Sequence, residues 1–270
     1  MSVLMLRIIT AVVLLATILP AIFLAPFWLW VPFCVMAAAA CSIEWCRLAE
    51  ISGLAKLWQV IVTAGATAAF LWYAIEAVWI YWIAMLIWTL VFGIVSQHRI
   101  VNFDRKIKVV AGSFLIFSAI VALSSLRNAA PEFLLAVMAI VWISDTSAYA
   151  AGNLFGKHKL APLISPGKSW EGVVGAMIAV CLYALILRIF FPDFGARDGV
   201  IRHQSAWVFA ITWVGLAIAG IVGDLGESWA KRVAGVKDSG NLLPGHGGVL
   251  DRVDALLPVL PLAALIYLWN

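Results

Sequence analysis

Apolar segments long enough to cross a bilayer recur along this chain, and they constrain its fold more than any other feature. About nine stretches have the length of roughly 20 mostly apolar residues that a spanning helix needs. They lie at residues 7–24, 27–43, 58–75, 77–95, 109–125, 132–150, 172–191, 206–225 and 253–269. Only 12% of the 270 residues are charged, too few to cover the surface of a soluble protein of this size. The sequence therefore predicts an all-α, polytopic integral membrane protein with about nine transmembrane helices.

The basic residues indicate how these helices are oriented. With a cytoplasmic N-terminus, the cytoplasmic side would carry Arg7, Arg47, Lys56, Arg99, Arg105, Lys106, Lys108, Lys157, Lys159, Lys168, Lys231, Arg232, Lys237 and Arg252. The opposite side would carry Arg127, Arg188, Arg197 and Arg202. Lysine and arginine are enriched in cytoplasmic loops, so this asymmetry favours an N-in, C-out topology. The net charge of +4 is explained in the same way and is not a nucleic-acid-binding signal.

Polar residues with a recognisable pattern are concentrated in the second half of the chain. We therefore expect residues 1–130, with about five helices, to form a transmembrane scaffold. Residues 131–270, with about four helices and their cytoplasmic loops, are expected to form the catalytic region. Ionisable groups at membrane depth are costly to maintain, so their presence indicates a functional site.

The densest polar stretch runs from residue 223 to residue 254, between two apolar segments. If the helix continues beyond residue 225, one face carries Asp224, Glu227, Ser228 and Lys231. Asp251 and Asp254 open the last span, three residues apart. A solvated helix end, or simple capping of a helix N-terminus, would also explain some of these acids. Two helices that present carboxylates to the same membrane edge are better explained by Mg²⁺, which proteins hold with one or two carboxylates plus substrate phosphates.

Glycines and basic residues lie between these acids. The run His246-Gly247-Gly248 precedes the last span, and exposed backbone amides in such a turn can bind an anion. Four cations are in or next to the same loop: Lys231, Arg232, Lys237 and Arg252. The positive-inside rule could account for each cation alone. Together with the acids, they indicate a site for nucleotide or phosphate with a divalent metal.

A second polar cluster lies upstream. Asp145 falls within a predicted span, where an unpaired carboxylate would be costly. Ser165 followed by Pro166 is typical of the N-cap and first position of a helix, here the seventh span. Lys168 and Ser169 do not belong to a P-loop, because the required glycine is absent five residues before Gly167. Lys168 is nevertheless well placed to contact phosphate.

These motifs resemble a known family. The pattern Ser228-x-x-Lys231-Arg232-x4-Lys237-Asp238, continued by Pro244-x-His246-Gly247-Gly248-x-x-Asp251-Arg252-x-Asp254, closely resembles the signature of phosphatidate cytidylyltransferases, or CDP-diacylglycerol synthases. The segments 145–149 and 165–172 also look like upstream blocks of that family. The resemblance covers about the last half of the chain. Ala230 departs from it, at a packing position where a larger aliphatic residue is expected.

The resemblance implies a membrane nucleotidyltransferase of phospholipid biosynthesis that converts CTP and phosphatidic acid into CDP-diacylglycerol and pyrophosphate. It further implies Mg²⁺, a monovalent cation such as K⁺, a homodimer, and an active site at the cytoplasmic face of a bacterial inner membrane. We assign catalysis to Asp224, Asp251, Lys237 and His246. Metal binding is assigned to Asp224, Asp251, Asp254 and Glu227. The expected substrate contacts are Asp145, Ser165, Lys168, Ser169, Ser228, Lys231, Arg232, Asp238, Gly247, Gly248 and Arg252.

Two other functions remain open on the sequence. One is CTP chemistry on a different lipid phosphate or lipid alcohol. The other is an ion-coupled transporter that uses Asp145 and Asp224 as coupling carboxylates. A transporter of the duplicated type would show an internal repeat, which this chain lacks, and would place its acids near the midplane.

Overall fold

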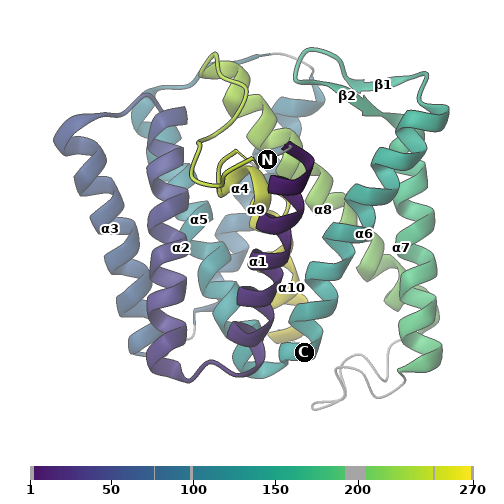
Figure 1. Cartoon of the computed structure of the whole chain (residues 1–270), viewed down its shortest axis with the longest axis horizontal. Coiled ribbons are helices and arrows are strands. Elements are labelled where there is room, and N and C mark those ends of the chain that lie inside the picture. The colour runs from purple at the N-terminus through teal and green to yellow at the C-terminus, as the bar shows by residue number, and fades with distance from the viewer. Residues whose placement is uncertain (1–2, 76, 98–99, 192–204, 246, 269–270) are drawn as a thin grey trace.

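The fold is built almost entirely from helices. A computed structural model describes residues 3–75, 77–97, 100–191, 205–245 and 247–268. The elements in chain order are α1 (Val3–Phe23), α2 (Phe27–Leu48), α3 (Gly53–Trp72), α4 (Val78–Ser96), α5 (Arg105–Ala129), α6 (Pro131–Phe155), β1 (Lys159–Ala161), β2 (Ser165–Ser169), α7 (Trp170–Phe190), α8 (Ala206–Val233), α9 (Leu250–Val253) and α10 (Leu256–Leu268). A helix lies at each predicted apolar stretch (Figure 1).

Among the described residues, seven helices, α2 to α8, are long and apolar enough to cross a membrane. The helix α10 has 13 residues, and a four-residue helix, α9, precedes it. The count of nine spans and their orientation therefore stay predictions. The helix α8 continues to Val233, eight residues beyond the predicted end of its apolar stretch, because charged residues end the apolar run without ending the helix.

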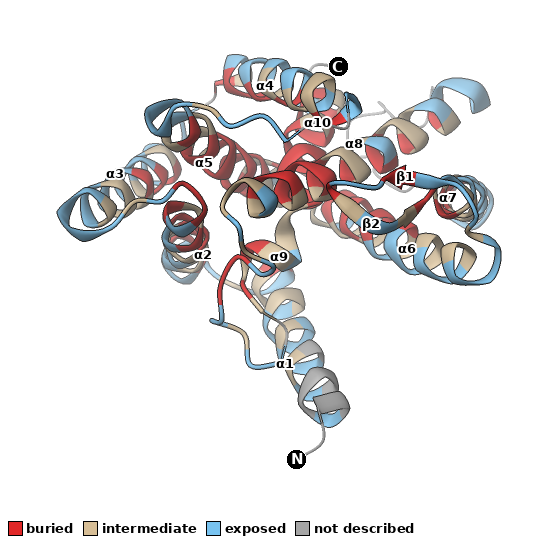
Figure 2. Cartoon of the chain, turned by 90° about the horizontal axis from the view of Figure 1, so that it is seen from above, coloured by how far each residue is buried: buried red, intermediate tan, exposed pale blue. Residues whose placement is uncertain are grey.

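The core follows the helices α5 and α10. Ten of the 13 residues of α10 are buried, and this helix packs against α4, α5 and α8 (Figure 2). The outer helices α3 and α7 instead expose large apolar side chains, including Trp58, Val62, Ile178 and Leu182. Such surfaces are costly in water and suited to lipid. The helix packing thus fits a protein whose outer surface meets a bilayer.

The helical bundle has one end where most of the irregular chain gathers. The β1–β2 hairpin, the α2–α3 turn and the long segment between α8 and α9 all lie at the same end, shown at the top of Figure 1. The helix α7 ends and α8 begins at the opposite end (Figure 1). Three of the predicted basic residues, Arg99, Arg197 and Arg202, lie outside the described residues. The predicted cytoplasmic loops therefore share one end of the molecule.

One local prediction is wrong. Ser165 and Pro166 do not begin the seventh helix, because residues 165–169 form β2 and pair antiparallel with β1. The helix α7 begins at Trp170 instead, and Ser169 is its N-cap: its Oγ accepts a hydrogen bond from the Gly172 N–H at 3.2 Å. The small hairpin also makes the fold slightly less than all-helical.

Candidate active site

The helix α8 carries the predicted polar stripe on one continuous helix. Asp224 forms an ion pair through Oδ2 with the Lys168 Nζ of β2, at 2.5 Å. Its Oδ1 accepts a hydrogen bond from the Ser228 Oγ, at 3.3 Å. The hairpin is held to α8 a second time, because the Arg232 Nε donates to the Ile164 carbonyl at 3.1 Å. Two sequence-predicted clusters, one on β2 and one on α8, therefore meet.

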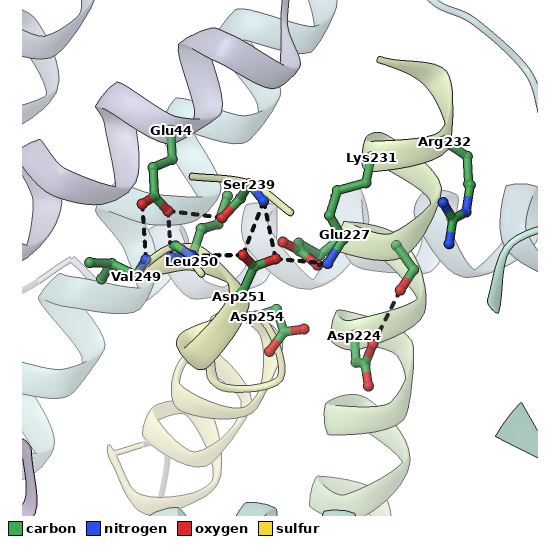
Figure 3. Close-up of polar contacts among 12 residues, drawn as sticks. Glu44, Asp224, Glu227, Lys231, Arg232, Ser239, Val249, Leu250, Asp251 and Asp254 are labelled. Carbon is green, nitrogen blue, oxygen red and sulfur yellow. Dashed lines mark hydrogen bonds and ion pairs between the residues drawn. The ribbon is translucent and has the colours of Figure 1, made fainter. Parts of the chain in front are cut away.

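A close contact between α8 and the start of α10 brings a second acid to Asp224. Gly223 has no side chain, and a Cβ built on it would lie 2.5 Å from the Asp254 carbonyl oxygen and 2.8 Å from the Pro258 Cδ. This contact lets the two backbones approach, so that Asp254 faces α8 near Asp224 (Figure 3). The negative charge of Asp254 lies within electrostatic range of the Asp224 carboxylate. The two carboxylates thus form an acid pair, of which Asp224 is also paired with Lys168.

Asp251 is bound differently. Its side chain is 7% exposed, and its Oδ1 accepts from the Lys231 Nζ at 2.8 Å. Its Oδ2 accepts from the N–H groups of Ser239, at 3.0 Å, and Gly248, at 2.8 Å. Burial alone would raise the pKa of Asp251, but its hydrogen bonds, including those from Lys231 and Gly248, outweigh it and lower the pKa to about 2. Asp251 therefore holds the loop and Lys231 in place.

Lys231 lies between two acids. It pairs with Asp251 and also with Glu227 one turn earlier on α8, and its side chain is 15% exposed. Glu227 is itself buried. The other predicted cations, Arg232, Lys237 and Arg252, are exposed, as is Asp238. The basic residues thus divide into one internal cation and three that face solvent.

Of the predicted residues upstream of α8, some lie close to Asp224 and others have a structural role. Asp145 on α6 is exposed and lies within electrostatic range of Asp224 and Lys168. Ser165 is partly exposed on β2, whereas Ser169 is buried as the cap of α7. The structure brings Asp145 and Lys168 to Asp224, and it gives Ser169 a structural hydrogen bond.

Two glycines of the loop before α9 have a left-handed backbone conformation. Gly245 and Gly247 have φ values of +76° and +82°, which favour glycine. The amides that follow already donate to carboxylates of the protein: Gly248 to Asp251, and Val249 and Leu250 to Glu44. His246 lies outside the described residues.

Glu44 is the residue that the sequence reasoning missed. It lies on α2, in the half expected to supply scaffold, and is 3% exposed beneath the loop that precedes α9 (Figure 3). Glu44 directly follows the apolar run 27–43. An ionisable residue at or beside a predicted span is costly and indicates a function, which is the argument that identified Asp145 and Asp224, and it could have identified Glu44 as well.

The donors at this site suit a hard divalent cation. Among the described residues, no three acidic, histidine or cysteine side chains form a ready-made metal cage. Mg²⁺ does not need one, because it is commonly held by one or two carboxylates together with waters and substrate phosphates. Asp224 and Asp254 supply such carboxylates, whereas both oxygens of Asp251 are occupied by protein donors.

Comparison with known proteins identifies a family and several relatives that this chain resembles. The family described as "Cytidylyltransferase family" matches residues 5–269. A protein of Pseudomonas aeruginosa named phosphatidate cytidylyltransferase is 36% identical over 274 residues, covering 97% of this chain and 96% of the relative. Relatives of the same name from Haemophilus influenzae and Staphylococcus haemolyticus are 46% and 38% identical, over 50% and 67% of this chain. These two alignments span 45% and 65% of the relatives' own length.

Proposed function

The chain belongs to the cytidylyltransferase family, and from this premise we propose that it joins CTP to phosphatidic acid, giving CDP-diacylglycerol and pyrophosphate. The names of its relatives support this reaction. The observation in this chain that carries the proposal is the acid pair Asp224 and Asp254, with Lys168 bound to Asp224, at the end of the bundle where the loops gather. A triphosphate and its metal need both kinds of charge in one place.

We place this site at the cytoplasmic face of a bacterial inner membrane, in a protein of nine spans with N-in, C-out topology. The gathering of the basic loops at the same end as the acid pair supports this orientation. A site at that membrane edge would let a water-soluble nucleotide meet a lipid headgroup. A homodimer remains part of the proposal, from the family resemblance alone.

The proposed reaction is an in-line phosphoryl transfer. A phosphate oxygen of phosphatidic acid attacks the α-phosphorus of CTP and forms a new P–O bond. The bond from the α-phosphorus to the bridging oxygen breaks, and the pair of electrons leaves with pyrophosphate. The lipid phosphate is already substantially ionised near neutral pH, so no general base is needed. The protein's task is to position the reactants and neutralise their charge.

In this proposal, Asp224 and Asp254 would hold Mg²⁺, with Asp145 within electrostatic range of Asp224. When bound, the metal supplies positive charge that stabilises the transferring phosphoryl group. Asp251 and Glu227, the other two predicted ligands, would act on Lys231, to which both are bound. A monovalent cation such as K⁺ stays an expectation from the family.

Four cations and the loop would complete the substrate site. Lys168, Arg232, Lys237 and Arg252 are proposed to contact the phosphates of CTP and of the lipid. We propose that Ser165, Ser228, Asp238, His246, Gly247 and Gly248 line the pocket around them. Ser169 would act mainly by capping α7, so that Lys168 is held at the end of β2.

The proposal is tested with purified protein in detergent–lipid micelles that contain phosphatidic acid. Each of the four nucleoside triphosphates is added in turn, with and without Mg²⁺, and pyrophosphate release and lipid-linked nucleotide are followed together. We expect both signals with CTP and neither after chelation of Mg²⁺. If well-folded protein gives no signal with any nucleotide, the phosphatidic acid assignment is wrong, and other lipid phosphates and lipid alcohols are then tested as acceptors.

A further inference from the structure

Glu44 lies beneath the loop that leads to Asp251 and binds it at three points. Its Oε1 accepts from the Val249 N–H at 3.0 Å, and its Oε2 accepts from the Leu250 N–H at 2.8 Å and from the Ser239 Oγ at 2.9 Å. These partners are about 200 residues away in sequence, so the contact joins the first half of the chain to the second. The neighbouring Arg47 also donates to the Ser239 carbonyl, at 3.4 Å.

The donors around Glu44 require a carboxylate. A carboxylate has only acceptors, and each of its oxygens faces at least one backbone N–H. A glutamine amide in the same place would put its NH₂ group against the N–H of either Val249 or Leu250, whichever way it turned. One backbone donor would then lose its partner inside the protein, where that loss is most costly.

Two glycines of the loop are explained by the same carboxylate. A Cβ on Gly240 would lie 2.3 Å from the Glu44 Oε1, and its three nearest atoms would all belong to Glu44. A Cβ on Gly248 would lie 2.4 Å from the Glu44 Oε2 and 2.1 Å from the Ser239 Oγ. Neither glycine is among the residues with positive φ. Their lack of a side chain therefore serves the close packing of the loop on Glu44.

Ser239 connects this anchor to the site. Its hydroxyl donates to Glu44 while its backbone N–H donates to Asp251. On the other side of the loop, the N–H of Gly248 binds Asp251 and the next two N–H groups bind Glu44. The loop thus donates hydrogen bonds to two carboxylates, those of Glu44 and Asp251. Asp251 also forms an ion pair with Lys231 (Figure 3).

We propose that Glu44 is a positioning residue: it fixes Ser239, Val249 and Leu250 so that Asp251 and Lys231 are held in place at the nucleotide site. This assigns a role in the reaction to α2 and the first half of the chain. The inference rests on the proposed function for its kinetic consequences, whereas its structural consequence can be measured without any substrate.

The first test is limited proteolysis of the full-length protein in micelles. Trypsin can cut after Lys237, which is exposed between α8 and α9, and after Lys157, which is exposed between α6 and β1. In Glu44→Gln we expect cleavage after Lys237 to accelerate at least about tenfold, and cleavage after Lys157 to stay unchanged. Glu50→Gln is the matched control, because the Glu50 side chain is 53% exposed and paired with Lys108 at 3.6 Å. Cleavage of Glu44→Gln after Lys237 at the wild-type rate would overturn the proposal.

The second test separates positioning from loss of folded protein. We expect Glu44→Gln to raise KM for CTP at least about tenfold while KM for phosphatidic acid stays unchanged. A purely structural role would lower kcat in proportion to the folded fraction and leave both KM values unchanged, and that outcome would refute the proposal. If the wild-type protein does not use CTP, the proposed function fails, and proteolysis still decides the role of Glu44.

A pair of further variants keeps the test valid if Glu44→Gln folds poorly. Gly240→Ala should loosen the loop because its Cβ meets the Glu44 carboxylate. In a Glu44→Ala background the obstacle is gone, so Gly240→Ala should add no further acceleration of cleavage after Lys237. Independent, multiplicative effects of the two substitutions would contradict the proposed contact.

Discussion

Replacing Gly223 by alanine should push α8 away from α10 and thereby damage the acid pair. The new Cβ would lie 2.5 Å from the Asp254 carbonyl oxygen and 2.8 Å from the Pro258 Cδ. Ordinary contact begins near 3.4 Å, so the helices must separate by about 0.9 Å. Both neighbours are parts of the backbone or of a proline ring, so no flexible side chain can move aside. The strain is therefore transmitted to the position of Asp254 relative to Asp224.

The expected magnitude follows from two opposing effects. Overpacking of a filled interior costs about 1–3 kcal/mol. Alanine in a helix interior regains about 1 kcal/mol relative to glycine. We therefore expect Gly223→Ala to lose up to about 2 kcal/mol of stability, or several degrees in Tm. Because a misplacement of about 1 Å at a reacting centre can cost about 100-fold in rate, the loss of kcat should be much larger than the loss of stability.

Gly220→Ala is the matched control on the same helix. A Cβ on Gly220 would meet the Val259 Cγ2 at 3.5 Å and the Ala255 Cβ at 3.8 Å, which are ordinary contacts. This variant should keep wild-type turnover and gain up to about 1 kcal/mol of stability. The assays are CTP turnover with phosphatidic acid and thermal unfolding in the same micelles. Equal Tm and kcat for the two variants would refute the argument that Gly223 sets the distance between the acids.

Three further predictions concern the site. Asp224→Asn and Asp254→Asn should each lower kcat at least about 100-fold with little change in helical circular dichroism, because each removes a proposed metal ligand; near-normal turnover would contradict the assignment. Lys168→Met should raise KM for CTP about tenfold through loss of a charged phosphate contact, with Lys159→Met as the exposed control on the same hairpin. Ser169→Ala should cost about 1 kcal/mol in thermal unfolding and leave KM unchanged, because its hydroxyl caps α7; a KM change without loss of stability would favour the predicted substrate contact instead.

The helices could be predicted because a bilayer sets their length. Stretches of apolar residues near 206–225 and 253–269 marked α8 and α10, and the spacing of Asp224, Glu227 and Lys231 placed them along one helix face. The exact ends could not be predicted, because a helix that leaves the membrane continues through polar residues. The apolar pattern stops at that point, and backbone hydrogen bonds continue.

The hairpin was missed for a related reason. A serine before a proline is typical of a helix start, and nothing local to Ser165 shows that residues 159–161 are available to pair with it. Strand pairing depends on two segments at once, so it is decided by tertiary context. Ser169, four residues later, supplies the cap that Ser165 was expected to provide.

The sequence by itself determined the chemistry of the site: which acids, cations and glycines are present, and that they follow one family signature. Tertiary structure alone decided how they are used. It placed Asp254 against α8 through the missing side chain of Gly223, and it bound both oxygens of Asp251 to the protein. It also brought Glu44 from α2 to the loop before α9. A linear pattern records residue types and spacing, whereas close approach and hydrogen bonding between distant segments exist only once the helices have packed.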